Sequence, residues 1–151
     1  MLTFRPATPD QYDDFLRVLK TEAAEYLAAT LRFMGMTKDE FARLFRTVGE
    51  VRGIYDGEDL AGFYWIEKRQ DVLHLHALIL KRQSQGKGIG TRVLETLATK
   101  YRVTVTEIEL SVHVSNTRAR TMYERNGFAI VKTPKDLGFY IMRKPLTLNL
   151  G

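Results

Sequence analysis

Three glycines at alternate positions form the part of this chain with the clearest chemical meaning. The segment 85–91 reads Gln-Gly-Lys-Gly-Ile-Gly-Thr, follows an apolar run and precedes a helical pattern. Glycine has no Cβ, so a ligand can approach the backbone closely there. A helix that begins at such a segment leaves N–H groups free at its positive end. The segment therefore predicts a site for a phosphate or a pyrophosphate.

Two well-known phosphate-binding motifs differ from this segment. The P-loop has four residues between its first glycine and a Gly-Lys-Ser/Thr ending, whereas Gly86-Lys87 is followed directly by Gly88. The dinucleotide fingerprint Gly-x-Gly-x-x-Gly requires its third glycine one position after Gly90. An oxidoreductase that binds a nicotinamide dinucleotide remains an alternative, and the position of the third glycine argues against it.

A second pattern lies downstream of the glycines. Asn116, Ala119 and Tyr123 are spaced so that they share one face of a helix, and Gly127-Phe128 follows the expected helix end. The two patterns together resemble the signatures of the GCN5-related N-acetyltransferase (GNAT) superfamily. These are Gln/Arg-x-x-Gly-x-Gly/Ala and, after the next strand, Asn-x-x-Ala-x-x-x-Tyr-x-x-x-Gly-Phe. Many members have proline where this chain has Arg82.

The resemblance implies acetyl-CoA as the cofactor. In the family, main-chain groups at the end of the fourth strand pair with pantetheine, the glycine segment holds the pyrophosphate, and the asparagine bonds to the pantetheine arm. Carried over to this sequence, the implied cofactor-binding residues are Leu78, Ile79, Leu80, Gln85, Gly86, Lys87, Gly88, Ile89, Gly90, Thr91, Asn116, Ala119 and Tyr123. For the adenosine phosphates, the sequence leaves Lys87, Arg92 and Arg82 open.

The resemblance also implies a catalytic role for Tyr123, whose hydroxyl would protonate the departing CoA thiolate. The base that deprotonates the amine acceptor is less clearly marked. His74 and His76 lie two residues apart on a strand, and an imidazole suits proton transfer near neutral pH. We therefore expect one of these histidines to act as the base, directly or through a water. Glu67 and His113 are further candidates.

The elements that must position these residues follow from hydrophobic periodicity. Apolar residues at helical spacing predict one helix over 12–27 after a capping box at 8–11, and a shorter helix after a second capping box at 37–40. Helices are also expected over 91–101 and 116–126. Strands are expected at 2–7, 51–55, 60–67, 72–80, 103–114, 128–132 and 138–144.

This order predicts a single α/β domain over 1–151. Its mixed sheet would have helices on both faces. The resemblance further implies a GNAT-like acyl-CoA N-acyltransferase fold, in which a mostly antiparallel sheet splays between strands 4 and 5 to admit the cofactor.

Composition narrows the remaining function classes. Without cysteine, the chain has no thiolate metal site, disulfide or cysteine nucleophile, and we expect no bound metal. No apolar run is long enough to cross a bilayer, so we expect no membrane span. Together with the lack of a signal-peptide pattern, this favours a cytoplasmic protein. The net charge of +5 is spread along the chain, which argues against nucleic acid as the partner. A nucleic-acid-binding module and a non-catalytic CoA sensor remain alternatives.

The partner that we expect is an amine acceptor, either a small molecule or a peptide. An apolar, aromatic acceptor site is expected near Tyr26, Phe33 and Trp65. The resemblance also leaves a homodimer as an option.

Overall fold

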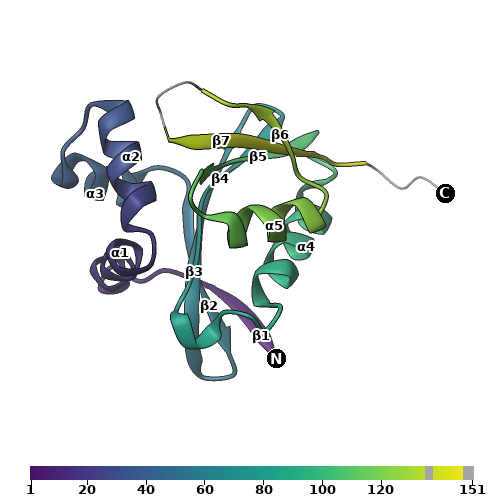
Figure 1. The fold of residues 1–151 in the computed structure, drawn as a ribbon. Helices are drawn as coiled ribbons and strands as arrows, with labels where there is room; N and C mark the ends of the chain where they lie inside the picture. The colour runs from purple at the N-terminus through teal and green to yellow at the C-terminus, as the bar shows by residue number, and fades with distance from the viewer. Residues whose placement is uncertain (135–137, 148–151) are drawn as a thin grey trace.

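The computed structural model describes residues 1–134 and 138–147, which form one seven-stranded sheet with helices on both faces (Figure 1). The strands are β1 (Leu2–Pro6), β2 (Glu50–Asp56), β3 (Asp59–Arg69), β4 (Val72–Leu80), β5 (Glu107–His113), β6 (Ala129–Lys132) and β7 (Phe139–Pro145). The helices are α1 (Gln11–Glu22), α2 (Ala24–Met34), α3 (Lys38–Thr47), the 3₁₀ turn η1 (Arg82–Ser84), α4 (Ile89–Tyr101) and α5 (Thr117–Arg125).

The sheet has the strand order β1-β2-β3-β4-β5-β7-β6. Among the described strands, β4 and β5 pair in parallel and every other neighbouring pair is antiparallel. The α/β class and the mostly antiparallel sheet expected from the sequence are therefore confirmed.

The sheet opens between β4 and β5. Their pairing ends at Leu75 opposite Leu110, although β4 continues to Leu80 and β5 to His113. The cause lies in the pairing of β4 with β3, because Trp65 pairs with Ala77 and Ile66 with Leu75, which leaves His76 as an extra residue. A bulge of this kind bends its strand. The expected splay between strands 4 and 5 is thus present, and it starts at the bulge.

Two apolar layers hold the helices on the sheet. On one face α1, α2 and α3 cover a core of aromatic residues, in which Phe15 stacks on Phe63 with ring centroids 4.9 Å apart. On the other face α4 and α5 cover an aliphatic core that contains Val93, Leu94 and Leu97 of α4. Burying a side chain of this size contributes about 1.5–3 kcal/mol, so each layer fixes its helices firmly.

The first helical segment differs from the sequence prediction. A continuous helix was expected over 12–27, but the chain breaks at Ala23, whose φ of −139° and ψ of 42° lie outside the helical region. The N–H of Ala23 still donates to the Leu19 carbonyl, and the Leu27 N–H donates to the Ala23 carbonyl. The prediction of one helix was wrong because it relied on apolar periodicity, which continues through the break.

Two element starts also differ from the predictions. The expected capping box at 8–11 is half formed, because the Gln11 side chain accepts from the Thr8 N–H while α1 begins only at Gln11. The strand expected from 103 begins at Glu107, because residues 102–104 form a turn after α4. By contrast, Thr37 and Glu40 form the complete capping box expected before α3.

None of the helices described in residues 1–134 and 138–147 has the length and apolar character needed to cross a membrane.

Candidate active site

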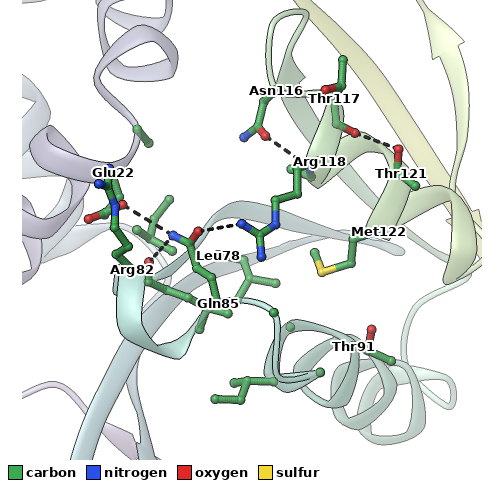
Figure 2. Close-up of a pocket in the computed structure, with 18 of the residues that line it drawn as sticks. Glu22, Leu78, Arg82, Gln85, Thr91, Asn116, Thr117, Arg118, Thr121 and Met122 are labelled. Atoms are coloured by element: carbon green, nitrogen blue, oxygen red, sulfur yellow. Dashed lines mark hydrogen bonds between the residues drawn. The ribbon is translucent and has the colours of Figure 1, made fainter.

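A cavity of about 810 Å³ lies where β4 and β5 diverge, between the end of β4, the glycine segment and α5 (Figure 2). Its lining contains Leu78, Ile79 and Leu80 of β4, Gln85, Gly86, Gly88, Ile89, Gly90 and Thr91 of the glycine segment, and Asn116 and Ala119 of α5. The structure therefore brings together most of the residues that sequence reasoning assigned to cofactor binding. Lys87 is the exception in the glycine segment, because it lies exposed outside this lining.

The glycine segment has the backbone conformation that a ligand loop requires at two of its three glycines. Gly86 and Gly88 have φ values of 76° and 79°, which L-residues with a side chain rarely adopt. Gly88 is the N-cap of α4, and a Cβ placed there would face open space. The first N–H groups of α4, at Ile89, Gly90 and Thr91, have no acceptor within the helix. The positive end of the helix therefore lies at the cavity.

Gly90 has a role beyond the one expected. A Cβ at this position would lie 2.7 Å from Sδ of Met122 in α5, so glycine allows α4 and α5 to approach each other. Gly90 therefore also has a packing role that the motif does not show, while it still lines the cavity and its N–H lies at the start of α4.

Asn116 marks the start of α5 and caps it. Its side-chain oxygen accepts a hydrogen bond of 3.1 Å from the Ala119 N–H, as an N-cap asparagine commonly does. Sequence reasoning gave this side chain a bond to the cofactor. In the structure its oxygen is used locally, while the residue still lines the cavity.

Tyr123 lies deeper than the cavity lining, with 7% of its surface exposed. It packs edge-on against Phe128 with ring centroids 5.7 Å apart, while its neighbour Met122 lines the cavity. Burial raises the pKa of the Tyr123 hydroxyl well above its usual value, and the nearby Tyr26 raises it further. The hydroxyl is therefore protonated at every physiological pH, as a proton donor must be.

Tyr26 of α2 reaches the point where the two strands diverge. Its hydroxyl donates a 2.8 Å hydrogen bond to the carbonyl of His76, the bulged residue of β4. Burial raises the pKa of this phenol as well. Tyr26 also raises the pKa of Tyr123, so the two phenols, which come from helices on opposite faces of the sheet (Figure 1), lie near each other.

His74 and His76 lie away from the cavity lining, on the face of the sheet that α1, α2 and α3 cover. Nε2 of His76 donates a 2.8 Å hydrogen bond to the Glu67 carboxylate, and the His76 ring lies 4.5 Å from that of Trp65. Nδ1 of His74 lies 3.1 Å from Glu109. Burial lowers the pKa of both imidazoles despite these carboxylates. Both rings are therefore mostly neutral at pH 7 and able to accept a proton.

Glu67 and His113, the other candidate bases, each form hydrogen bonds with further polar residues. Glu67 also contacts Arg69, and hydrogen bonds from Arg69 and His76 lower the pKa of the carboxyl. His113, at the end of β5, shares a 2.7 Å hydrogen bond with Ser115, whose hydroxyl donates to Glu25 of α2. This contact joins α2 to the loop before α5.

Sequence reasoning missed several residues of the cavity wall, because no motif marks them. They are Glu22 and Ala23 at the break between α1 and α2, and Thr117, Arg118, Thr121, Met122 and Arg125 on α5. The helical spacing of the α5 residues could have indicated a shared face. The two residues from the α1–α2 break could not have been found, because the break itself was not expected.

Comparison with known protein families shows which family the chain belongs to. The model described as the Acetyltransferase (GNAT) family matches residues 13–128. This chain belongs to the GNAT acetyltransferase family. The matched segment includes both motifs that resembled the family signatures, from Gln85 to Phe128, and the family assignment made from them is confirmed.

A curated relative of this GNAT chain is the mycothiol acetyltransferase of Corynebacterium efficiens. The two are 29% identical over 100 residues, which is 64% of this chain and 33% of the relative. The chain thus matches only about a third of the length of that relative.

Solved structures share the fold of this GNAT chain over nearly its whole length. Ard1 from Thermoplasma volcanium has a TM-score of 0.76 at 18% identity, covering 97% of this chain and 99% of its own. The PaiA N-acetyltransferase from Thermoplasma acidophilum, solved in complex with coenzyme A, has a TM-score of 0.69 at 22% identity, covering 96% and 99%.

Proposed function

We propose that this chain is an N-acetyltransferase that moves an acetyl group from acetyl-CoA directly to a primary amine while both are bound. Membership of an acetyltransferase family supports the acyl-transfer class and the acyl donor. The observation that carries the proposal is the cavity at the splay, bounded by the start of α4 and by the free edge of β4. The absence of cysteine favours direct transfer over a cysteine-bound acetyl group.

The residues of the cavity fit coenzyme A. Gly88 opens onto free space, and the start of α4 offers N–H groups to a diphosphate. Beyond Leu75, β4 presents main-chain N–H and C=O groups to the cavity, where an extended pantetheine arm can pair with them. Acetyl-CoA supplies the acyl group as an activated thioester.

Tyr123 is proposed as the general acid. Its hydroxyl is protonated, and its helix neighbour Met122 lines the cavity. A phenol with a raised pKa gives up its proton less readily than free tyrosine, so we expect its hydrogen bond to a developing thiolate to contribute more than complete proton transfer.

His76 or His74 is proposed as the base. An alkylammonium ion cannot attack a thioester, so the acceptor must lose a proton first. His76 occupies the bulge where the strands diverge, and both imidazoles are neutral near pH 7. The acceptor amine would then approach from the face covered by α2, opposite the cofactor cavity.

The test combines binding with turnover. Calorimetry with coenzyme A, acetyl-CoA and NAD⁺ is expected to detect binding of the first two. A thiol-release assay with acetyl-CoA is then run across polyamines, amino acids, aminoglycosides and peptides with free N-termini, and at least one class is expected to accelerate release. Binding of NAD⁺ or an oligonucleotide in place of coenzyme A would overturn the proposal. Coenzyme A binding without turnover on any amine would favour a sensor.

A further inference from the structure

Arg118 reaches across the cofactor cavity from α5 to the glycine segment (Figure 2). Its Nη1 donates a 3.4 Å hydrogen bond to Oε1 of Gln85. Its Nη2 lies 3.1 Å from the position that a Cβ on Gly86 would occupy. The guanidinium therefore lies directly over the segment whose N–H groups begin α4.

Gln85 is held so that its oxygen faces this guanidinium. Its amide nitrogen donates a 3.0 Å hydrogen bond to the Leu80 carbonyl at the end of β4, and a second of 3.4 Å to Glu22. With its nitrogen committed to these acceptors, the side chain presents Oε1 to Arg118. Glu22, Gln85 and Arg118 thus form a chain of contacts from the α1–α2 break to α5.

The charge of this wall is unbalanced. Arg82, Arg118 and Arg125 line the cavity, against the single carboxylate of Glu22. Of the three, Arg118 is the one with a guanidinium nitrogen against Gly86. Arg125 lies seven residues further along α5, about 10 Å away along the helix axis. An arginine fork binds phosphate oxygens through two parallel N–H groups, so position and charge both favour Arg118.

We propose that Arg118 is a diphosphate-binding residue, which clamps the diphosphate of the cofactor against the Gly86–Gly90 backbone while Gln85 holds the guanidinium in place. This assignment rests on the proposed function and names a side chain for a contact that the motif leaves to main-chain groups. Gln85 contacts Nη1, and Nη2 lies against Gly86, so the guanidinium can keep Gln85 on one nitrogen while another binds a phosphate oxygen.

The test measures affinity rather than turnover. Isothermal calorimetry compares coenzyme A, dephospho-coenzyme A and pantetheine on the unaltered protein, Arg118→Gln and Arg125→Gln. Arg118→Gln is expected to weaken coenzyme A and dephospho-coenzyme A equally, by roughly tenfold to a hundredfold, and to leave the affinity for pantetheine unchanged. Arg125→Gln, which removes the same charge from the same helix, is expected to change each affinity by less than about threefold.

Three results would overturn the assignment. Unchanged affinity for coenzyme A in Arg118→Gln would show that the guanidinium does not hold the cofactor. A loss confined to coenzyme A would place it on the 3′-phosphate instead. Equal losses of affinity in the two variants would mean that Arg118 contributes only long-range electrostatic attraction and no direct contact.

The unaltered protein separates this proposal from the proposed function. If it binds none of the three compounds, the function fails and the assignment of Arg118 fails with it. If it binds coenzyme A, only the comparison of variants bears on Arg118. Circular dichroism and thermal unfolding of both variants confirm that each is folded, which the exposure of Arg118 leads us to expect.

Discussion

Tyr123 shows how the surroundings of one residue set its chemistry. Its motif identified it, but only the structure shows that it is buried beside Phe128 and that burial raises the pKa of its hydroxyl. A permanently protonated phenol can donate but cannot act as a base near neutral pH. The environment of Tyr123 is thus compatible with the general-acid role proposed from the sequence, and it is not compatible with a general-base role.

Tyr123→Phe removes the hydroxyl and keeps the packed ring. We expect kcat to fall about a hundredfold or more at every pH between 6 and 9, because a positioned acid contributes about that much. Affinity for coenzyme A is expected to stay the same. Steady-state kinetics and calorimetry measure the two quantities. Turnover equal to that of the unaltered enzyme would remove Tyr123 from the mechanism.

The two strand histidines give the fold a pH dependence of known sign. Burial lowers the pKa of both below the usual value of 6.5, so the unfolded chain binds more protons there than the folded chain. Their contribution to stability is complete above pH 6.5 and is lost as pH falls through the lower pKa values of the folded state.

His74→Gln and His76→Gln together are expected to reduce the loss of unfolding free energy between pH 7 and pH 5. Urea denaturation at several pH values in this window measures it. The slope is the readout, because the substitutions also change packing against Trp65. A slope identical to that of the unaltered protein would show that these imidazoles are not the groups that titrate.

At the scale of elements, the contact between α4 and α5 determines why the third glycine is required. Gly90 and Met122 meet so closely that a Cβ at position 90 would force the Met122 side chain to shift. The motif cannot distinguish this packing role from a ligand role, since both require glycine. The same applies to Asn116, whose spacing in the motif is equally consistent with a helix cap.

Gly90→Ala is expected to lower the unfolding free energy by about 1–3 kcal/mol through overpacking. In a Met122→Ala background the same change is expected to be neutral or slightly stabilising, because alanine favours the helix over glycine. Chemical denaturation of the four proteins in this double-mutant cycle measures the coupling. Additive effects would mean that Met122 does not cause the requirement for glycine at this position.

The break between α1 and α2 shows where sequence reasoning reached its limit. Apolar spacing through Leu27 is uninterrupted, and no proline or glycine marks Ala23. Tertiary contacts flank the break: the Tyr26 hydroxyl donates to the His76 carbonyl, and the Gln85 amide donates to Glu22. Local periodicity contains no information about such partners, which lie fifty or more residues away in the chain.

At the scale of the whole molecule, the sheet is one continuous structure with a single built-in opening among its described strands. Element order and the two motifs were sufficient to predict the class and the family, and most of the residues assigned from them to cofactor binding line one cavity. They were not sufficient for the bulge at His76, because a register shift depends on how β3 and β4 pair and not on the composition of either. The bulge in turn determines where the opening begins.

A ligand that fills the opening is expected to stabilise the entire fold. At a hundred times its dissociation constant, coenzyme A would raise the unfolding free energy by about 2.7 kcal/mol. For a chain of this size, that corresponds to a rise of roughly 5–10 °C in Tm. Thermal unfolding with and without coenzyme A measures the shift, and pantetheine alone serves as a comparison. An unchanged Tm at saturation would mean that the ligand binds the unfolded chain equally well.

The contact between the rings of Trp65 and His76 also suits Trp65 to report on the protonation of His76 through its fluorescence. Trp65 is the chain's single tryptophan, so all of its indole fluorescence comes from a fluorophore 4.5 Å from that imidazole. A protonated imidazole quenches indole emission more strongly than a neutral one. We therefore expect the emission intensity of the native enzyme to change as His76 is protonated, so that fluorescence can follow this residue without a label.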